Sequence, residues 1–384
     1  MTSTRRRLPA LATWLVATCL CAQNVLEFKQ HNMKKWGIPA GNYSGIAPIG
    51  GDRYALISDK QTADGWTEVS ISFLPSGDIG TMRFVAHHFD ARTSGHARDS
   101  EGIVCPEGRS FFVSAENDQQ VVELDGNGTP TGRRLAVPAC FSTPNIFANY
   151  GFEALTYQAD GGIFWTTTEQ GLKTDAAAPI TPKAPSPALL RLQSFGPDLQ
   201  PLRQYAYSTE QPTTKRKPRY YAFGVPELLA VDDSTLIVME RELNIPRRYN
   251  RAKCRIRLFR VNPHSGKAIA DTSLPLREAE ENSFLTKTPL HAFSTGIRLF
   301  GKKNFANYEG MCLGPKLPDG RQTLLLVADS QNRSGNSLFR LKDYIKVLVF
   351  RPQKGSGIPT EGSRKQEARA IIINNGLHGF DGLS

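Results

Sequence analysis

Acidic residues recur at matching places in five similar segments of the chain. Each segment starts with a polar or aromatic lead, an acid or serine, a small or apolar residue and an aliphatic residue. It then passes through a turn into a second apolar stretch that ends in an acid. The two positions lie 13 to 20 residues apart, about the length of a β-hairpin with its turn. The pairs are Ser44 with Asp59, Glu101 with Glu116, Glu153 with Glu169, Glu227 with Glu240, and Glu309 with Asp329.

These spacings predict a cluster of carboxylates. In an antiparallel hairpin the start of the first strand and the end of the second lie side by side, so each pair is expected at one rim. Like charges held together must be neutralised by protons, by arginines or by a cation. Oxygen ligands without Cys or His favour calcium or magnesium over zinc or copper, and calcium suits an exported protein better. We therefore predict a calcium site. The alternative is that each acid only caps a turn.

Each candidate residue has a predicted role. Five of the acids are predicted to bind the metal ion: Glu101, Glu153, Glu169, Glu309 and Asp329. One carboxylate left free of the metal is predicted to take a proton from water as the catalytic base, and the candidates are Glu116 and Glu240. Basic residues beside the acids are predicted to hold an anionic substrate such as a phosphate ester: Lys60, Arg98 and Arg241. The alternative is that each of them balances a neighbouring carboxylate.

Other chemistries have little support in the sequence. There is no G-x-S-x-G elbow for a serine nucleophile, and no Cys/His spacing typical of zinc. His87, His88 and His96 fall close together and are a further source of a base, although exposed loop histidines are the commoner case. Lys and Arg are scattered rather than clustered with aromatic residues, so a nucleic-acid partner is not expected.

Secondary-structure signals are almost all those of β-strands. Short runs rich in β-branched and aromatic residues alternate with Gly, Pro, Asn and Asp, at 54–58, 68–74, 110–114, 120–124, 163–168, 235–240, 255–261, 323–328 and 345–350. The five segments start 57, 52, 74 and 82 residues apart, enough for about four strands each. We predict an all-β fold, a β-propeller of five or six blades, with a β-sandwich as the alternative.

The N-terminus has the layout of a signal peptide. A basic cluster, Arg5 to Arg7, precedes an apolar run at 8–20 and small residues before Gln23. We predict a signal peptide at 1–22 and one domain at 23–384, with a recognisable core at about 40–350 and a tail at 352–384; a short core helix is the alternative for the N-terminus. The mature chain would carry a net charge of +8 instead of +11, because three arginines and no acids are removed.

No later apolar run reaches membrane-spanning length. The expected location is therefore outside the cytoplasm, as a periplasmic, cell-surface or secreted monomer. Four cysteines remain after processing, and they allow three disulfide pairings. We favour Cys105 with Cys140, with four buried thiols as the alternative.

The residues around the acids resemble the phytase-like family, also described as "esterase-like activity of phytase". The similar segments run in order from about residue 40 to about 350, and they are 43–47 with 51–54, 99–103, 149–155, 236–242, 307–311, 319–321 and 324–330. Family acids map onto Glu101, Glu116, Glu153, Glu169, Glu240, Glu309 and Asp329. The chain departs from the pattern at Ser44, where the other copies have an acid, and at Ala154, which replaces Gly.

The resemblance implies a propeller-like fold and a phosphoester hydrolase that uses recurring Glu and Asp residues. Combined with the predicted cation site, it gives a metal-dependent phosphoester hydrolase acting on a small anionic substrate. Two other hypotheses remain open. One is a binding propeller without catalysis, and the other is a lactonase-type propeller whose cation polarises a lactone carbonyl.

Overall fold

The computed structural model describes residues 25–352, apart from 96–97, 109, 216–217, 248, 299, 302, 332, 334 and 336–339. The predicted signal peptide at 1–22, His96 and nearly all of the predicted tail lie outside the described residues. Within the described part, no helix is long and apolar enough to cross a bilayer.

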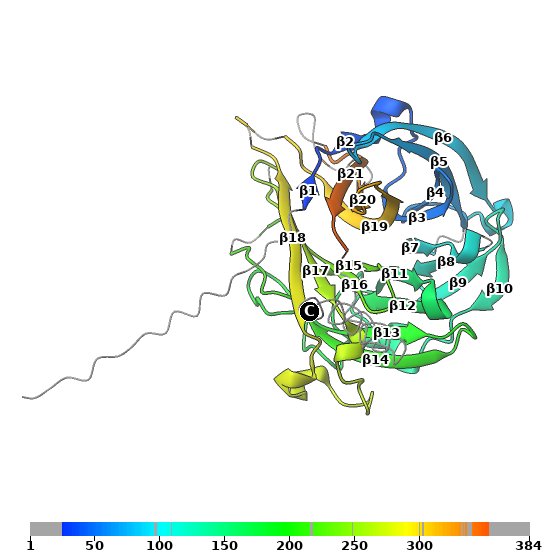
Figure 1. Ribbon diagram of the computed structural model, residues 1–384. Helices are drawn as coiled ribbons and strands as arrows, with labels where there is room; N and C mark the ends of the chain where they lie inside the picture. The colour runs from blue at the N-terminus through cyan, green and yellow to red at the C-terminus, as the bar shows by residue number, and fades with distance from the viewer. Residues whose placement is uncertain are drawn as a thin grey trace, which may run out of the picture.

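The described strands form five antiparallel sheets arranged around a centre, which confirms the propeller and sets its blade number at five (Figure 1). Blade 1 holds β3 (Tyr43–Gly50), β4 (Arg53–Ser58), β5 (Gly65–Phe73) and β6 (Ile79–Phe89). Blade 2 holds β7 (Ser100–Val104), β8 (Phe111–Ala115), β9 (Gln120–Leu124) and β10 (Pro130–Arg134). Blade 3 holds β11 (Phe152–Gln158), β12 (Ile163–Thr168), β13 (Leu189–Phe195) and β14 (Pro201–Ser208). Blade 4 holds β15 (Tyr220–Ala230), β16 (Leu236–Ile245), β17 (Lys253–Val261) and β18 (Lys287–Gly296).

The N-terminal strands complete the fifth blade. Here β19 (Asn307–Lys316), β20 (Gln322–Asp329) and β21 (Tyr344–Phe350) come from the end of the chain, while β1 (Leu26–Glu27) and β2 (His31–Asn32) pair with β21 from its start. The buried Lys346 of β21 strengthens this closure, because its Nζ donates to the Phe28 carbonyl at 2.6 Å and to Glu27 Oε1 at 2.8 Å. The two ends of the described chain therefore pair in one blade and close the ring.

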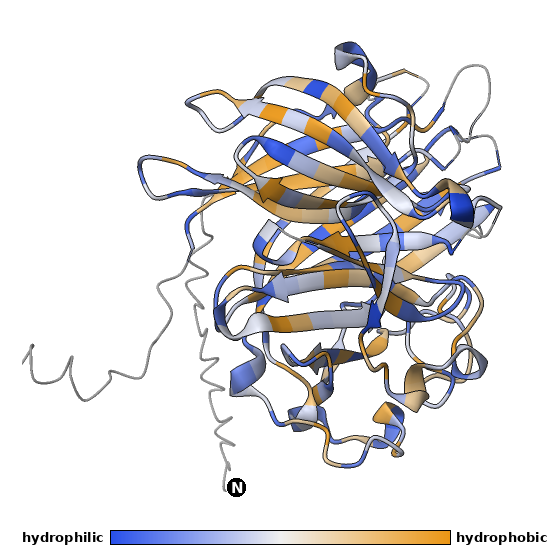
Figure 2. Cartoon of the chain, turned by 90° about the vertical axis from the view of Figure 1, so that its right-hand side faces the viewer, coloured by the Kyte–Doolittle hydropathy of each residue, from blue (hydrophilic) through white to orange (hydrophobic). Residues whose placement is uncertain are grey.

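The strands form because both faces of a blade are covered by its neighbours. Each of the five blade-to-blade interfaces has its own apolar cluster, with Phe112 of blade 2 against Phe164 of blade 3 as one example, at 4.6 Å between ring centroids. Figure 2 shows the apolar residues gathered along the strands, with polar residues in the connections. The burial of both faces explains the short, nearly continuous apolar runs of the sequence, two of which, Gln120–Leu124 and Ile163–Thr168, match β9 and β12 to the residue.

Glycines let the inner strands approach closely near the centre. A Cβ on Gly45 would lie 2.6 Å from the Glu101 carbonyl oxygen, and one on Gly310 would lie 2.4 Å from the Ser44 carbonyl oxygen. These contacts join β3 to β7 and β19 to β3 directly after the first acidic position of each hairpin. The small residue of the repeated pattern is therefore required by backbone contact between neighbouring blades.

The preferred Cys105–Cys140 disulfide is wrong. All four cysteines of the described part are free thiols. Cys105 follows the last residue of β7, at the end of this inner strand away from the acids, whereas Cys140 packs with Phe152 at the start of β11. Since neighbouring inner strands run in the same direction, the two thiols lie at opposite ends of the ring.

We predict that Gly310→Ala destabilises the protein by about 1–3 kcal/mol, because the added methyl group overlaps the backbone of Ser44 and Gly45. Urea unfolding measures the change. Gly126→Ala is the matched control, since a Cβ there has no atom of the described structure within 4 Å, and it should change stability by less than about 1 kcal/mol. Equal stability of the two variants would contradict the close approach of the inner strands.

Candidate functional site

Strand register brings the repeated acids to one end of the ring. In four blades the residue before the first acidic position pairs with the residue before the second. These pairs are Tyr43 with Ser58, Ser100 with Ala115, Phe152 with Thr168, and Tyr308 with Ala328. The two side chains of each repeated pair, which are Ser44 with Asp59 in blade 1 and two carboxylates in the other three blades, therefore start from adjacent backbone positions. These pairs supply seven carboxyl groups, and Asp99 lies close to Asp59 and Glu101. We call the eight together the acidic mouth: Asp59, Asp99, Glu101, Glu116, Glu153, Glu169, Glu309 and Asp329.

Blade 4 departs from this register by one residue. Glu227 pairs with Met239, in the place where Gly310 pairs with Val327 in blade 5. Two residues beyond Val327 lies Asp329, whereas two residues beyond Met239 lies Arg241. An arginine therefore occupies the second acidic position of blade 4, and Glu240 is displaced from it.

Arg241 neutralises part of the acidic mouth. Its Nη2 donates to Glu169 Oε1 and its Nη1 donates to Glu309 Oε1, and the Arg241 side chain is 3% exposed. Nη1 also donates to Asn307 Oδ1 at 3.2 Å, and Asn307 Nδ2 donates to Glu309 Oε1 at 2.8 Å. A residue predicted to hold substrate thus bridges two predicted metal ligands from blades 3 and 5.

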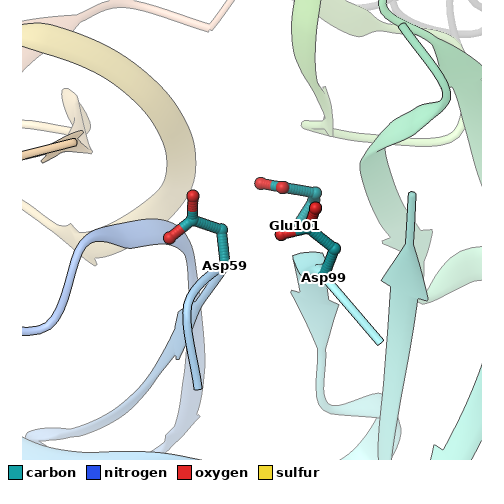
Figure 3. Close-up of side chains that lie close together, drawn as sticks. All are labelled: Asp59, Asp99 and Glu101. Atoms are coloured by element: carbon teal, nitrogen blue, oxygen red, sulfur yellow. The ribbon is translucent and has the colours of Figure 1, made fainter. Parts of the chain in front are cut away.

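A second cluster lies between blades 1 and 2. One carboxylate oxygen from each of Asp59, Asp99 and Glu101 lies within 4.8 Å of the others. Figure 3 shows Asp59, from the end of β4, facing Asp99 and Glu101, from the start of β7. Lys60 Nζ lies 2.9 Å from both Asp59 Oδ2 and Asp99 Oδ1. We call Asp59, Asp99 and Glu101 the carboxylate triad.

Two buried oxygens of the mouth have no hydrogen-bond partner within the described residues. They are Oδ1 of Asp59, whose side chain is 9% exposed, and Oδ2 of Asp329, which is fully buried. A buried carboxylate oxygen without a partner costs free energy, which a hard cation would remove by coordination. The triad supplies only oxygen donors, so the residues present fit calcium or magnesium.

Burial and mutual repulsion raise the pKa values of several carboxyl groups of the mouth. Burial raises the pKa of Glu101 well above its ordinary value, and the nearby Glu153 raises it further. Burial raises the pKa of Glu153 in the same way, with Glu169 adding to the effect and Arg241 opposing it. Burial raises the pKa of Asp59, and Lys60 opposes the change. The mouth therefore holds protons that a bound cation would displace.

The carboxyl groups of Glu116 and Glu309 have pKa values near neutral pH. Burial raises the pKa of Glu309 to about 7 although Arg241 lowers it. Burial raises the pKa of Glu116 to about 7 as well, opposed by the Gly151 N–H, which donates to Glu116 Oε1 at 2.9 Å. A carboxyl group with a pKa near 7 is suited to accept and return a proton at neutral pH.

Three predicted residues lie elsewhere or have other partners. Glu240 is fully buried away from the mouth, where its Oε1 accepts from Tyr207 Oη at 2.9 Å and from Lys287 Nζ at 2.7 Å. Arg98 donates from Nε and Nη2 to Asp118, and its buried Nη1 has no hydrogen-bond partner among the described residues. Glu227 lies among the inner strands, where its Oε1 accepts the N–H groups of Leu155 and Leu228 at 3.0 Å. The register shift of blade 4 explains the positions of both of its glutamates.

Sequence reasoning missed Asp99 as a candidate metal ligand. Asp99 lies two residues before Glu101, in the polar lead of its segment, where the other copies have no acid. Its φ of 56° places it in the left-handed region, which Asp tolerates better than most residues. The acid in an otherwise variable lead was the signal that could have identified it.

We predict that Arg241→Met destabilises the protein by about 3–5 kcal/mol at pH 8, because it leaves buried Glu169 and Glu309 without their cation. Urea unfolding measures the loss. Arg321→Met, which removes an exposed pair with Asp319, is the control and should cost at most about 1 kcal/mol. A small loss at Arg241 would mean that the mouth tolerates the uncompensated carboxylates.

We predict that the calcium-free protein loses stability as pH rises from about 5 to 8. The raised pKa values of Glu116 and Glu309, about 7 against an ordinary 4.5, contribute stability that is complete below about 4.5 and is lost as pH rises through about 7. Thermal unfolding in EDTA at several pH values measures the slope of stability against pH. Glu153→Gln, which resembles the protonated side chain, should flatten it, and an unchanged slope would contradict the raised pKa of Glu153.

Comparison with solved structures finds several enzymes at low similarity. A luciferin-regenerating enzyme is 11% identical, with 84% of this chain and 97% of that one covered and a TM-score of 0.38. An endo-arabinase from Bacteroides thetaiotaomicron is 12% identical over 84% and 97%, with a TM-score of 0.41, and a thermostable family-43 glycoside hydrolase is 10% identical over 83% and 93%, with a TM-score of 0.42. At these values the likenesses say nothing about the activity of this chain.

No curated protein matches the chain in sequence. A family model does match it. The phytase-like model, described as "esterase-like activity of phytase", covers residues 38–331, which span most of the five blades and include every carboxylate of the acidic mouth. The chain therefore belongs to the phytase-like family.

Proposed function

We propose that this protein is an exported, calcium-dependent hydrolase of small phosphate esters that acts at the acidic mouth. The observation that carries the proposal is the carboxylate triad, in which Asp59 has a buried oxygen without a partner beside Asp99 and Glu101. Family membership supports ester hydrolysis. Export rests on the N-terminal sequence, and a monomeric state remains part of the proposal.

The triad and Asp329 are the residues that would hold the cation. Asp59 and Asp329 each supply an oxygen that accepts no hydrogen bond within the described structure. Glu153 lies in the same mouth and can complete the ligand set, whereas Arg241 engages Glu169 and Glu309. A bound calcium ion would neutralise these carboxylates and attract the phosphoryl oxygens of the substrate. Arg241 would keep its two glutamates in place as the charge of the mouth changes.

Glu116 is the best placed general base. Its pKa of about 7 lets it take a proton from a water molecule at neutral pH, and the Gly151 N–H fixes the orientation of its carboxyl group. Lys60, half-exposed beside the triad, supplies a positive charge for the phosphate group. Arg98 can add its remaining N–H at Nη1. Glu240, enclosed by Tyr207 and Lys287, has a structural role in this proposal.

We predict that Asp59→Asn and Glu101→Gln each weaken calcium binding at least about 100-fold, because each removes a charged ligand from the triad. Isothermal titration calorimetry with calcium chloride measures the affinity, and hydrolysis of p-nitrophenyl phosphate should fall with it. Asp198→Asn is the control, since Asp198 is an exposed turn residue, and its affinity should equal that of the wild type.

Glu116→Gln separates binding from catalysis. It should keep calcium affinity within about threefold and lower kcat by about 100-fold or more, as expected for loss of a general base. Wild-type calcium affinity in the Asp59 and Glu101 variants would overturn the cation site. Calcium binding without turnover of any phosphate ester would favour the binding propeller, and turnover of lactones alone would favour the lactonase-type reading.

A further inference from the structure

A cavity opens on the same face as the acidic mouth, over blade 1. It has a volume of about 400 Å³ and its walls include Tyr43, Ser58, Lys60, Thr67, His87 and Phe89. These residues come from the start of β3, the end of β4, the start of β5 and the end of β6, which all lie at the mouth end of the blade. Of these six residues, only Lys60 has a role in the proposed reaction.

One side of the cavity is continuous with the carboxylate triad. Lys60 lines the cavity, and its Nζ lies 2.9 Å from oxygens of both Asp59 and Asp99. Ser58 and Ser330, also in the lining, are the chain neighbours of Asp59 and Asp329. These two acids supply the buried oxygens without partners. A ligand in the cavity would therefore reach the cation-binding side of the mouth past Lys60.

Another side of the cavity is aromatic. The rings of His87 and Phe89 stack, with centroids 4.9 Å apart and planes at 21°. Phe89 is 39% exposed, although it is a large apolar side chain. Thr67 Oγ1 lies 3.0 Å from His87 Nδ1, which fixes the orientation of the imidazole ring. A further planar ring can stack on the outer face of such a pair.

We propose that this cavity binds the planar ring of an aromatic phosphate monoester while its phosphate group lies beside Lys60, against the cation held by the carboxylate triad. The proposal rests on the proposed function and adds the substrate class. Phe89 and His87 contribute stacking, Lys60 contributes a charge-assisted hydrogen bond, and the volume accommodates one ring with a short substituent. Phe89 then determines specificity and has no role in the bond cleavage itself.

Phosphonates that cannot be hydrolysed test the cavity without turnover. Calorimetric titration of the calcium-loaded protein with benzylphosphonate and with methylphosphonate compares ligands that differ by a phenyl ring. Phe89→Ala should lower the affinity for benzylphosphonate by about tenfold, the upper range for an aromatic stacking pair. The affinity for methylphosphonate should not change. Phe300→Ala is the control, because Phe300 is 93% exposed, lies in the connection between β18 and β19 and does not line this cavity; neither affinity should change.

Each outcome decides between the two proposals. Equal benzylphosphonate affinities for the wild type and Phe89→Ala, or no phosphonate binding to the wild type, would overturn the aromatic subsite. In the first case calcium-dependent hydrolysis of small phosphate esters would still stand. Suppose that Phe89→Ala selectively loses affinity for benzylphosphonate while the wild type does not hydrolyse p-nitrophenyl phosphate. This result would support the subsite as a ligand site and overturn the proposed hydrolase.

Discussion

Repulsion among buried carboxylates is the constraint on which the mouth of this propeller depends. Eight carboxyl groups converge where the inner hairpins of the blades meet, and Arg241 and Lys60 are the cations that touch them within the described residues. Arg241 is fully enclosed and joins blades 3 and 5, while Lys60 joins blades 1 and 2. The remaining charge is suppressed by raised pKa values, so protons and a cation compete for the same oxygens.

The two cations divide the mouth into unlike halves. On the Arg241 side, Glu169 and Glu309 are satisfied by a buried guanidinium, and Asn307 supports the contact. On the Lys60 side the cation is half-exposed, and Oδ1 of Asp59 has no hydrogen-bond partner in the described part of the chain. This asymmetry directs the proposed calcium ion to the carboxylate triad. It also places the site next to the cavity over blade 1, where an organic group has room.

The fold tolerates the repulsion among the carboxylates because packing elsewhere stabilises the ring. Five apolar clusters between blades and the closure of blade 5 by β1 and β2 keep the ring together. Close backbone contacts at Gly45 and Gly310 then hold the inner strands at the separation that concentrates the carboxylates. Packing away from the mouth thus offsets the unfavourable repulsion within it, as is common at functional sites.

The sequence by itself determined the strands, the repeat and most of the acidic mouth, because hairpin length and strand alternation are local properties. Glu101, Glu116, Glu153, Glu169, Glu309 and Asp329 follow from that pattern. Only the tertiary structure decided which partner each carboxylate has. The one-residue register shift that puts Arg241 in an acidic position, and removes Glu240 from it, depends on how β15 pairs with β16. Asp99 joins the site, and Cys105 and Cys140 stay apart, because these positions depend on contacts between blades, which no local pattern encodes.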